Sequence, residues 1–164
     1  MRTVRAPKNA EPVAIEIAIQ RASRLRGLPT NRLMRAWITH ALRRFRTTAS
    51  LTVRIVDASE GAALNERWRG KRGPTNVLSF PAAGLERIAP ELLGDIVLCA
   101  PVLKTEAAAQ RKTIAAHCAH LLVHGTLHLL GYDHEKPRDA EKMERLETEL
   151  LGELEFADPY AERP

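Results

Sequence analysis

The chain has few cysteines and no long hydrophobic run. Its two cysteines, Cys99 and Cys118, lie within apolar stretches, and nothing in the sequence requires a disulfide between them. Free cysteines in such positions are usually small core residues, which indicates a reducing, cytoplasmic setting. No apolar stretch approaches the ~20 residues that span a bilayer, and the amino-terminal sequence MRTVRAPKNAEP lacks the apolar region of a secretory signal. We therefore expect a cytoplasmic protein that does not enter a membrane.

Aromatic residues are also scarce, at 4% of the 164 residues. Proteins that bind nucleic acid by stacking present exposed rings to the bases, so this composition argues against a stacking surface. Recognition of a nucleic acid would instead depend on phosphate contacts and shape. The sequence has no internal repeats and no long linkers, and its length suits one domain with a sizeable core.

The positive charge of the chain is concentrated near its amino terminus. Residues 1–48 hold 11 lysines and arginines against two glutamates, a balance of +9, so the remainder carries −4 of the overall +5. A helix expected over residues 31–46 has one broad apolar stripe, with Arg32, Arg35, Arg43 and Arg46 largely outside it. Such a face attracts polyanions such as RNA, although a solvated basic face with no partner remains an alternative.

Residues 124–134, HGTLHLLGYDH, have the spacing of a metal site. His124 and His128 are four residues apart, about one helical turn, so their imidazoles project from the same face of a helix. Gly131 can adopt the left-handed conformation that ends helices, and the chain can then turn back to bring His134 close as a third ligand. Three neutral imidazoles suit zinc and leave a fourth position for water. We therefore expect one zinc ion per chain.

The helix that carries these histidines, expected over residues 114–130, is apolar on every side, which predicts that it is buried. Buried imidazoles need partners, and this favours a role for the histidines. His117 and His120 fall on nearly the same face, one and two turns earlier. We interpret them as core residues or as groups that support the metal ligands.

The histidine spacing is shared with a large class of zinc peptidases. In those enzymes the residue after the first histidine is a glutamate that activates water, and here that position is Gly125. The missing general base argues against peptide hydrolysis. A metal in this site could still lower the pKa of water or neutralise a phosphate, with help from a second group.

A basic loop offers that second group. Residues 68–81, WRGKRGPTNVLSFP, combine Arg69, Lys71 and Arg72 with glycines and prolines and then a short apolar run, which is typical of an ordered loop before a strand. The planar guanidinium of arginine can bind a phosphate through two hydrogen bonds and stabilise the extra charge of a phosphoryl-transfer transition state. A solvated basic turn with no ligand is the alternative.

Three segments together resemble the bacterial rRNA maturation factor YbeY family, in the family's order and spacing: HGTLHLLGYDH, RGKRGPTNVLSFP (residues 69–81) and LGDIVLC (residues 93–99). The resemblance covers about residues 13–151, the core of a single domain of residues 1–164. It implies a zinc-dependent endoribonuclease that cuts single-stranded RNA, acting with the small ribosomal subunit in 16S rRNA 3′-end maturation and ribosome quality control. It also implies that His124, His128 and His134 bind zinc and that Arg69 is the functionally important basic residue. Lys71 and Arg72 are candidates for contacts with the RNA backbone, and no nucleotide cofactor is expected.

Two other functions stay open. One is a non-catalytic RNA-binding or ribosome-binding factor with a structural zinc, which the basic helix fits equally well. The other is a metallopeptidase, which Gly125 disfavours. For an endoribonuclease, the attacking group could be water or the ribose 2′-hydroxyl, and the residues do not distinguish the two.

The order of the expected elements indicates an α+β fold. Strands are expected at residues 13–19, 51–56, 76–80 and 95–99, and helices at residues 31–46, 58–68, 100–110, 114–130 and 137–154. They predict a small mixed four-stranded sheet, packed with about five helices around the buried histidine helix, without fixing the topology. The glutamates of the last helix are expected to form a solvated face.

Overall fold

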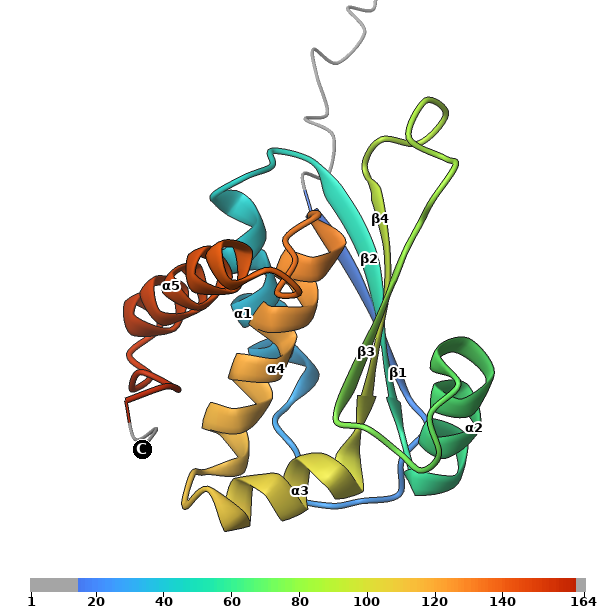
Figure 1. Ribbon diagram of the computed structural model, residues 1–164, viewed down its shortest axis with the longest axis vertical. Helices are drawn as coiled ribbons and strands as arrows, with labels where there is room; N and C mark the ends of the chain where they lie inside the picture. The colour runs from blue at the N-terminus through green and yellow to red at the C-terminus, as the bar shows by residue number, and fades with distance from the viewer. Residues whose placement is uncertain (1–14, 162–164) are drawn as a thin grey trace, which may run out of the picture.

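A four-stranded sheet lies between two unequal layers of helices (Figure 1). The computed structural model describes residues 15–161. The strand order is β1-β2-β4-β3, with β1 (Ile15–Arg21), β2 (Ala49–Val56), β3 (Val77–Pro81) and β4 (Leu92–Cys99). β1, β2 and β4 pair in parallel, whereas β3 pairs antiparallel with β4 and forms an edge of the sheet. The expected mixed sheet of an α+β fold is confirmed.

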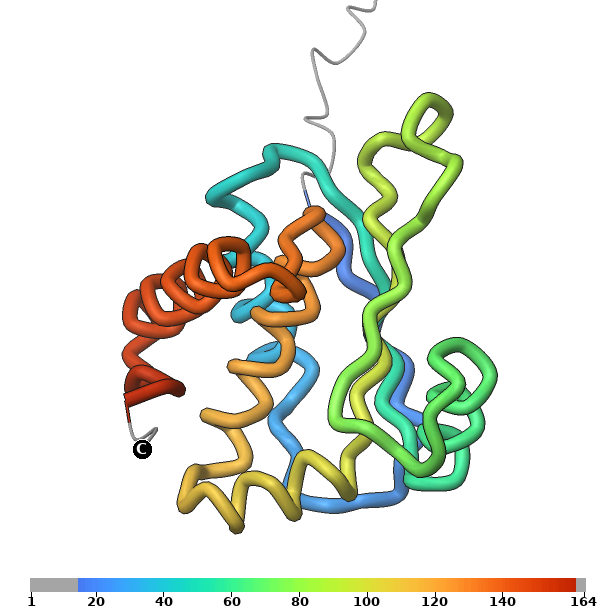
Figure 2. Tube along the Cα trace, viewed as in Figure 1, coloured from blue at the N-terminus to red at the C-terminus, as the bar shows by residue number. Residues whose placement is uncertain are grey.

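The five helices within the described residues are distributed unevenly over the two faces of the sheet. They are α1 (Asn31–Arg43), α2 (Ala58–Arg69), α3 (Ala100–Ala109), α4 (Ile114–Leu129) and α5 (Pro137–Glu153). In Figures 1 and 2, α1 and α4 cover one face, α5 lies on the outer side of α4, and α2 lies on the opposite face. α3 leads from the end of β4 to the start of α4.

α4 is the central helix of the fold. The side chain of Thr113 caps its start by accepting a hydrogen bond from the backbone N–H of Ala116 at 3.0 Å. Ten of its sixteen residues are buried, because β3, β4, α1, α3 and α5 all pack against it. The expected buried histidine helix is confirmed to within one residue. Its histidines are therefore held on a rigid, well-packed element.

The other expected elements are also present, and the differences lie at their ends. α1 ends three residues earlier than expected, at Arg43, and the carbonyl of Leu42 accepts backbone hydrogen bonds from the turn that follows. β4 begins at Leu92 rather than at residue 95 and continues through Gly94. A Cβ at Gly94 would lie 2.1 Å from the carbonyl oxygen of Phe80, so the close pairing of β3 with β4 requires glycine there. Residues 13–14 of the first expected strand lie outside the described residues.

Both cysteines occupy the core positions that the sequence predicts. Cys99 and Cys118 are buried and are not joined in a disulfide. Burial raises the pKa of the Cys118 thiol to about 12, so this thiol is protonated and unreactive near neutral pH. Across residues 15–161, no helix combines the length and the apolar character needed to cross a membrane.

Candidate metal centre

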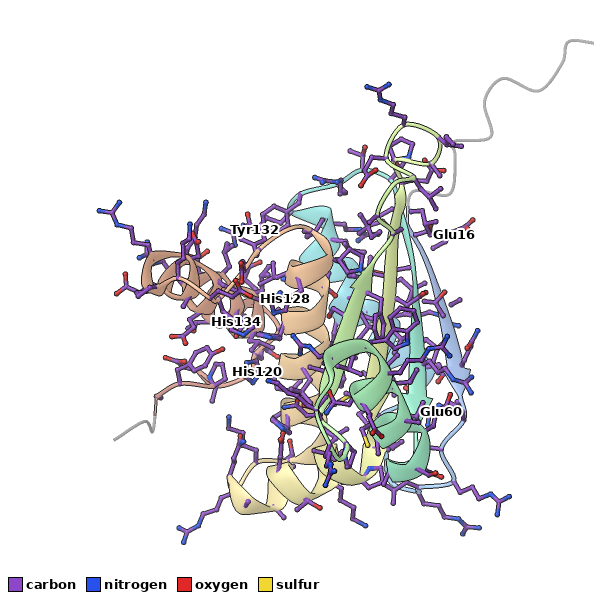
Figure 3. All side chains as sticks on the ribbon, turned by 45° about the vertical axis from the view of Figure 1, so that its right-hand side comes forward. Glu16, Glu60, His120, His128, Tyr132 and His134 are labelled. Carbon is purple, nitrogen blue, oxygen red and sulfur yellow. The ribbon has the colours of Figure 1, made fainter. Side chains whose placement is uncertain are left out.

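Three imidazole rings converge near the end of α4, and Figure 3 shows two of them, His128 and His134, side by side. His124 and His128 are one turn apart on α4, and their Nε2 atoms are 3.1 Å from each other. His134 comes from the segment after the helix, and its Nδ1 is 3.0 Å from Nε2 of His128. One nitrogen of each ring lies within 4.8 Å of the corresponding nitrogens of the other two. The three nitrogens are therefore close enough to hold one metal ion.

Gly131 makes the turn that delivers His134. Its φ of +97° lies in the left-handed region that favours glycine. Its backbone N–H donates to the carbonyl of His128 at 3.0 Å, and the next N–H, from Tyr132, donates to the carbonyl of Leu127 at 3.0 Å. These two bonds close the helix and reverse the chain, as the sequence predicts.

The surroundings of His128 keep its ring neutral. Burial and the neighbouring imidazoles of His124 and His134 lower the pKa of His128 to about 4. His128 is therefore uncharged near neutral pH and has a nitrogen lone pair to donate. Since imidazoles bind metals only in the neutral form, this donor set fits a zinc ion.

A buried carboxylate on α5 orients His124. Glu147 is 1% exposed, and its Oε1 lies 2.5 Å from Nδ1 of His124. Its Oε2 lies 2.9 Å from Nε2 of His120 and accepts a hydrogen bond from the Tyr160 hydroxyl. Burial alone would raise the pKa of Glu147, but hydrogen bonds from His120, His124 and Tyr160 lower it to about 2. Because an ionised carboxylate can only accept, Nδ1 of His124 carries the proton and Nε2 is left free to bind a metal.

Glu147 shows that the expectation of a fully solvated glutamate face on α5 is wrong. The buried residues of α5 are Met143, Glu147, Leu150 and Leu151, which form one stripe against α4. A glutamate inside an otherwise apolar stripe is a pattern that can be found in the sequence. It distinguishes Glu147 from the exposed glutamates of the same helix.

His120 and His117 lie on the preceding turns of α4, and only His120 contacts the carboxylate that orients His124. His120 and His124 both contact the carboxylate of Glu147, so His120 helps to fix the position of that carboxylate. His117 is buried and pairs with Glu106 of α3 at 2.7 Å. Neither belongs to the group of histidines that could hold a metal, in agreement with the interpretation from the sequence.

Gly125 allows α4 to lie close to the sheet. A Cβ at this position would be 3.2 Å from Oγ of Ser79 and 3.3 Å from side-chain carbons of Ile96. β3 and β4 therefore occupy the space that a glutamate side chain would need at position 125. The packing adds a steric reason, beside the chemical one, against the peptidase mechanism.

The triad lines a cavity of about 250 Å³ that also includes Arg69. Arg69 is the last residue of α2, and the helix ends there because Gly70 takes a left-handed φ of +64°. The remaining wall is the edge of β3 and the segment before it: Thr75, Asn76, Val77, Ser79 and Pro81. Among the described residues, no carboxylate lines this cavity, so a phosphate would meet no negative side chain. Lys71 and Arg72 are exposed and lie outside the lining.

Replacing Glu147 with glutamine is expected to weaken zinc binding by about 10-fold to 100-fold, the usual cost of losing the partner of a metal-bound histidine. The amide keeps the shape of the carboxylate, but it carries no charge and cannot accept from both His124 and His120. Competition with a coloured chelator measures the affinity. Glu149→Gln is the matched control, because Glu149 is exposed and pairs with Arg44 at the surface. Equal zinc affinity in the two variants would contradict the orienting role.

Comparison with known proteins identifies relatives over nearly the whole chain. The family model described as Endoribonuclease YbeY matches residues 18–155. Endoribonuclease YbeY of Xanthomonas axonopodis pv. citri (strain 306) is 52% identical over 154 residues, which are 92% of this chain and 96% of the relative. Endoribonuclease YbeY of Stenotrophomonas maltophilia (strain R551-3) is 51% identical with the same coverage. The solution structure of a Thermotoga maritima protein matches 88% of this chain and 99% of its own, with a TM-score of 0.55 and 25% sequence identity. Because the family model matches most of the chain and these relatives share about half of its residues, the chain belongs to the endoribonuclease YbeY family.

Proposed function

We propose that this protein is a zinc-dependent endoribonuclease that cuts single-stranded RNA. The observation that carries the proposal is the cavity that combines three imidazole nitrogens with the guanidinium of Arg69. Imidazoles without thiolates or carboxylates suit zinc, and the arginine suits a phosphate. Membership of a family whose curated relatives are named endoribonucleases agrees with this chemistry.

In the proposed mechanism His124, His128 and His134 would hold the ion, which would supply Lewis acidity at the phosphoryl group and activate the attacking group. Glu147 keeps His124 in the tautomer that binds. Arg69 binds the non-bridging phosphate oxygens and stabilises the negative charge that develops at phosphorus.

The exposed cations are proposed to bind the RNA backbone. Lys71 and Arg72 follow Arg69 in the loop before β3 and are exposed. Arg32, Arg35 and Arg43 are exposed along α1. These groups fit a polyanion, and we propose that it is rRNA of the small ribosomal subunit, with roles in 16S rRNA 3′-end maturation and ribosome quality control. The free, buried cysteines fit the reducing cytoplasm where such work takes place.

Purified protein is expected to cut a single-stranded RNA. It should lose this activity when a chelator removes the metal and regain it when zinc is added back. Circular dichroism before and after chelation shows whether the domain stays folded without the ion. A structural zinc in a non-catalytic RNA-binding factor predicts the opposite: unfolding on chelation and no cleavage at any zinc concentration. Hydrolysis of casein, with no cleavage of RNA, would support the peptidase alternative. End-group analysis of the products assigns the attacking group, since attack by the ribose 2′-hydroxyl leaves a 2′,3′-cyclic phosphate.

A further inference from the structure

Trp68 is the largest exposed aromatic residue of the described chain. It precedes Arg69 at the end of α2, and its side chain is 60% exposed. The ring is held in place rather than loose. It makes a T-shaped contact with Phe80 of β3, with ring centroids 6.1 Å apart, and the guanidinium of Arg67 lies over one side of the ring, 5.2 Å from its centroid. A fixed and exposed indole offers a large flat surface to a ligand, and its surroundings decide which ligand fits.

Trp68 lines a second cavity, of about 620 Å³, that adjoins the candidate metal centre. This second cavity lies between α2 and the sheet, on the face opposite to α4. Figure 3 shows Glu60, one of its lining residues, across the sheet from His128 and His134. Ser79 and Pro81 of the edge strand β3 line both cavities. One extended molecule that crosses the β3 edge would therefore contact both.

The chemistry of the two cavities differs in a way that matches the parts of a nucleotide. The first cavity, called here the metal cavity, is lined by Arg69 and the three histidines. A guanidinium and a cation held by imidazoles would both attract a phosphate. The second cavity has apolar walls from Trp68, Leu64, Phe80 and Val97. Its polar groups include the carboxylate of Asp95 and the ion pair of Arg54 with Glu60 at 2.7 Å. A phosphate would be repelled by these carboxylates, whereas an uncharged base with hydrogen-bond donors on its edge would be accepted.

We propose that Trp68 is a stacking platform for one unpaired base of the RNA, next to the phosphate held in the metal cavity. This inference rests on the proposed function and extends it to the choice of substrate. A base in a duplex is already stacked and paired, so only a single strand can place a base on Trp68 while its phosphate lies at Arg69. The preference for single-stranded RNA then has a physical source, although aromatic residues are only 4% of the chain.

Tryptophan fluorescence tests the stacking directly, because the chain has two tryptophans and the other one, Trp37, is 5% exposed. Rapid mixing of the zinc-loaded protein with a single-stranded RNA is expected to quench the emission before cleavage develops. Trp68→Phe should retain most of the RNA affinity but lose the quench. A quench of equal size in Trp68→Phe, or no quench in the parent at saturating RNA, would overturn the proposal.

Trp68→Ala is expected to raise KM for single-stranded RNA by about 10-fold to 100-fold, with a much smaller change in kcat. Trp68→Phe should restore most of the loss, because phenylalanine keeps an aromatic face on which a base can stack. An unchanged KM in a folded Trp68→Ala variant would overturn the proposal. The proposed function is judged separately, by whether the parent protein cuts RNA at all.

Discussion

Replacing His134 with alanine is expected to abolish tight zinc binding and, with it, RNA cleavage. His134 supplies one of the three nitrogens of the triad from a short turn outside the helix, so its loss removes a proposed zinc ligand without disturbing the packing of α4. Two imidazoles leave half of a tetrahedral site to water and bind zinc less tightly than three. The loss of affinity should exceed the ~10-fold to 100-fold that removal of an orienting hydrogen bond costs. Elemental analysis after dialysis measures the retained zinc.

The control for this change is His40→Ala, which also removes a histidine but lies on α1 and pairs at the surface with Glu153. It should keep about one zinc per chain and parental cleavage. His134→Ala should unfold thermally close to the parent when both proteins are compared without metal, since the side chain is exposed. Retention of zinc with parental affinity by His134→Ala would show that the three histidines are not the site.

The histidine group could be predicted because its geometry is local. His124, His128 and Gly131 belong to one helix and its end, where a fixed rise and twist convert spacing directly into position. The bounds of α4 were predicted to within one residue for the same reason. Its apolar composition on every side also predicted its place at the centre of the fold.

The rest of the site depends on packing between distant segments. Arg69 and the triad share a cavity only because α2 ends beside the β3 edge. The composition of the loop suggested it as the second group of the site, and resemblance to a family singled out Arg69. Glu147 was missed because a glutamate on a charged helix is normally solvated, and its burial follows from which face of α5 meets α4. Composition argued against a stacking surface, and a composition cannot show that one of the few aromatic rings, Trp68, is exposed.

Replacing Arg69 with alanine is expected to lower the rate of RNA cleavage by on the order of 10² to 10³, equivalent to roughly 3–4 kcal/mol of transition-state stabilisation. The guanidinium lines the cavity with the triad but is not a metal ligand, so zinc content and thermal stability should stay close to the parent. Arg69→Lys keeps the charge and loses the planar pair of donors, so it should restore only part of the rate. Single-turnover cleavage at saturating RNA isolates this step from binding.

Arg72→Ala separates the role of Arg69 from the general attraction of a basic loop. Arg72 is exposed three residues further along the same loop and lies outside the cavity, so its loss should weaken RNA binding and reduce the salt dependence of that binding. At saturating RNA the rate of the chemical step in Arg72→Ala should match the parent, while Arg69→Ala stays slow. If Arg69→Ala also recovers the parental rate at saturation, Arg69 only binds RNA. The charge at phosphorus would then have to be stabilised by the metal or by another group that lines the cavity.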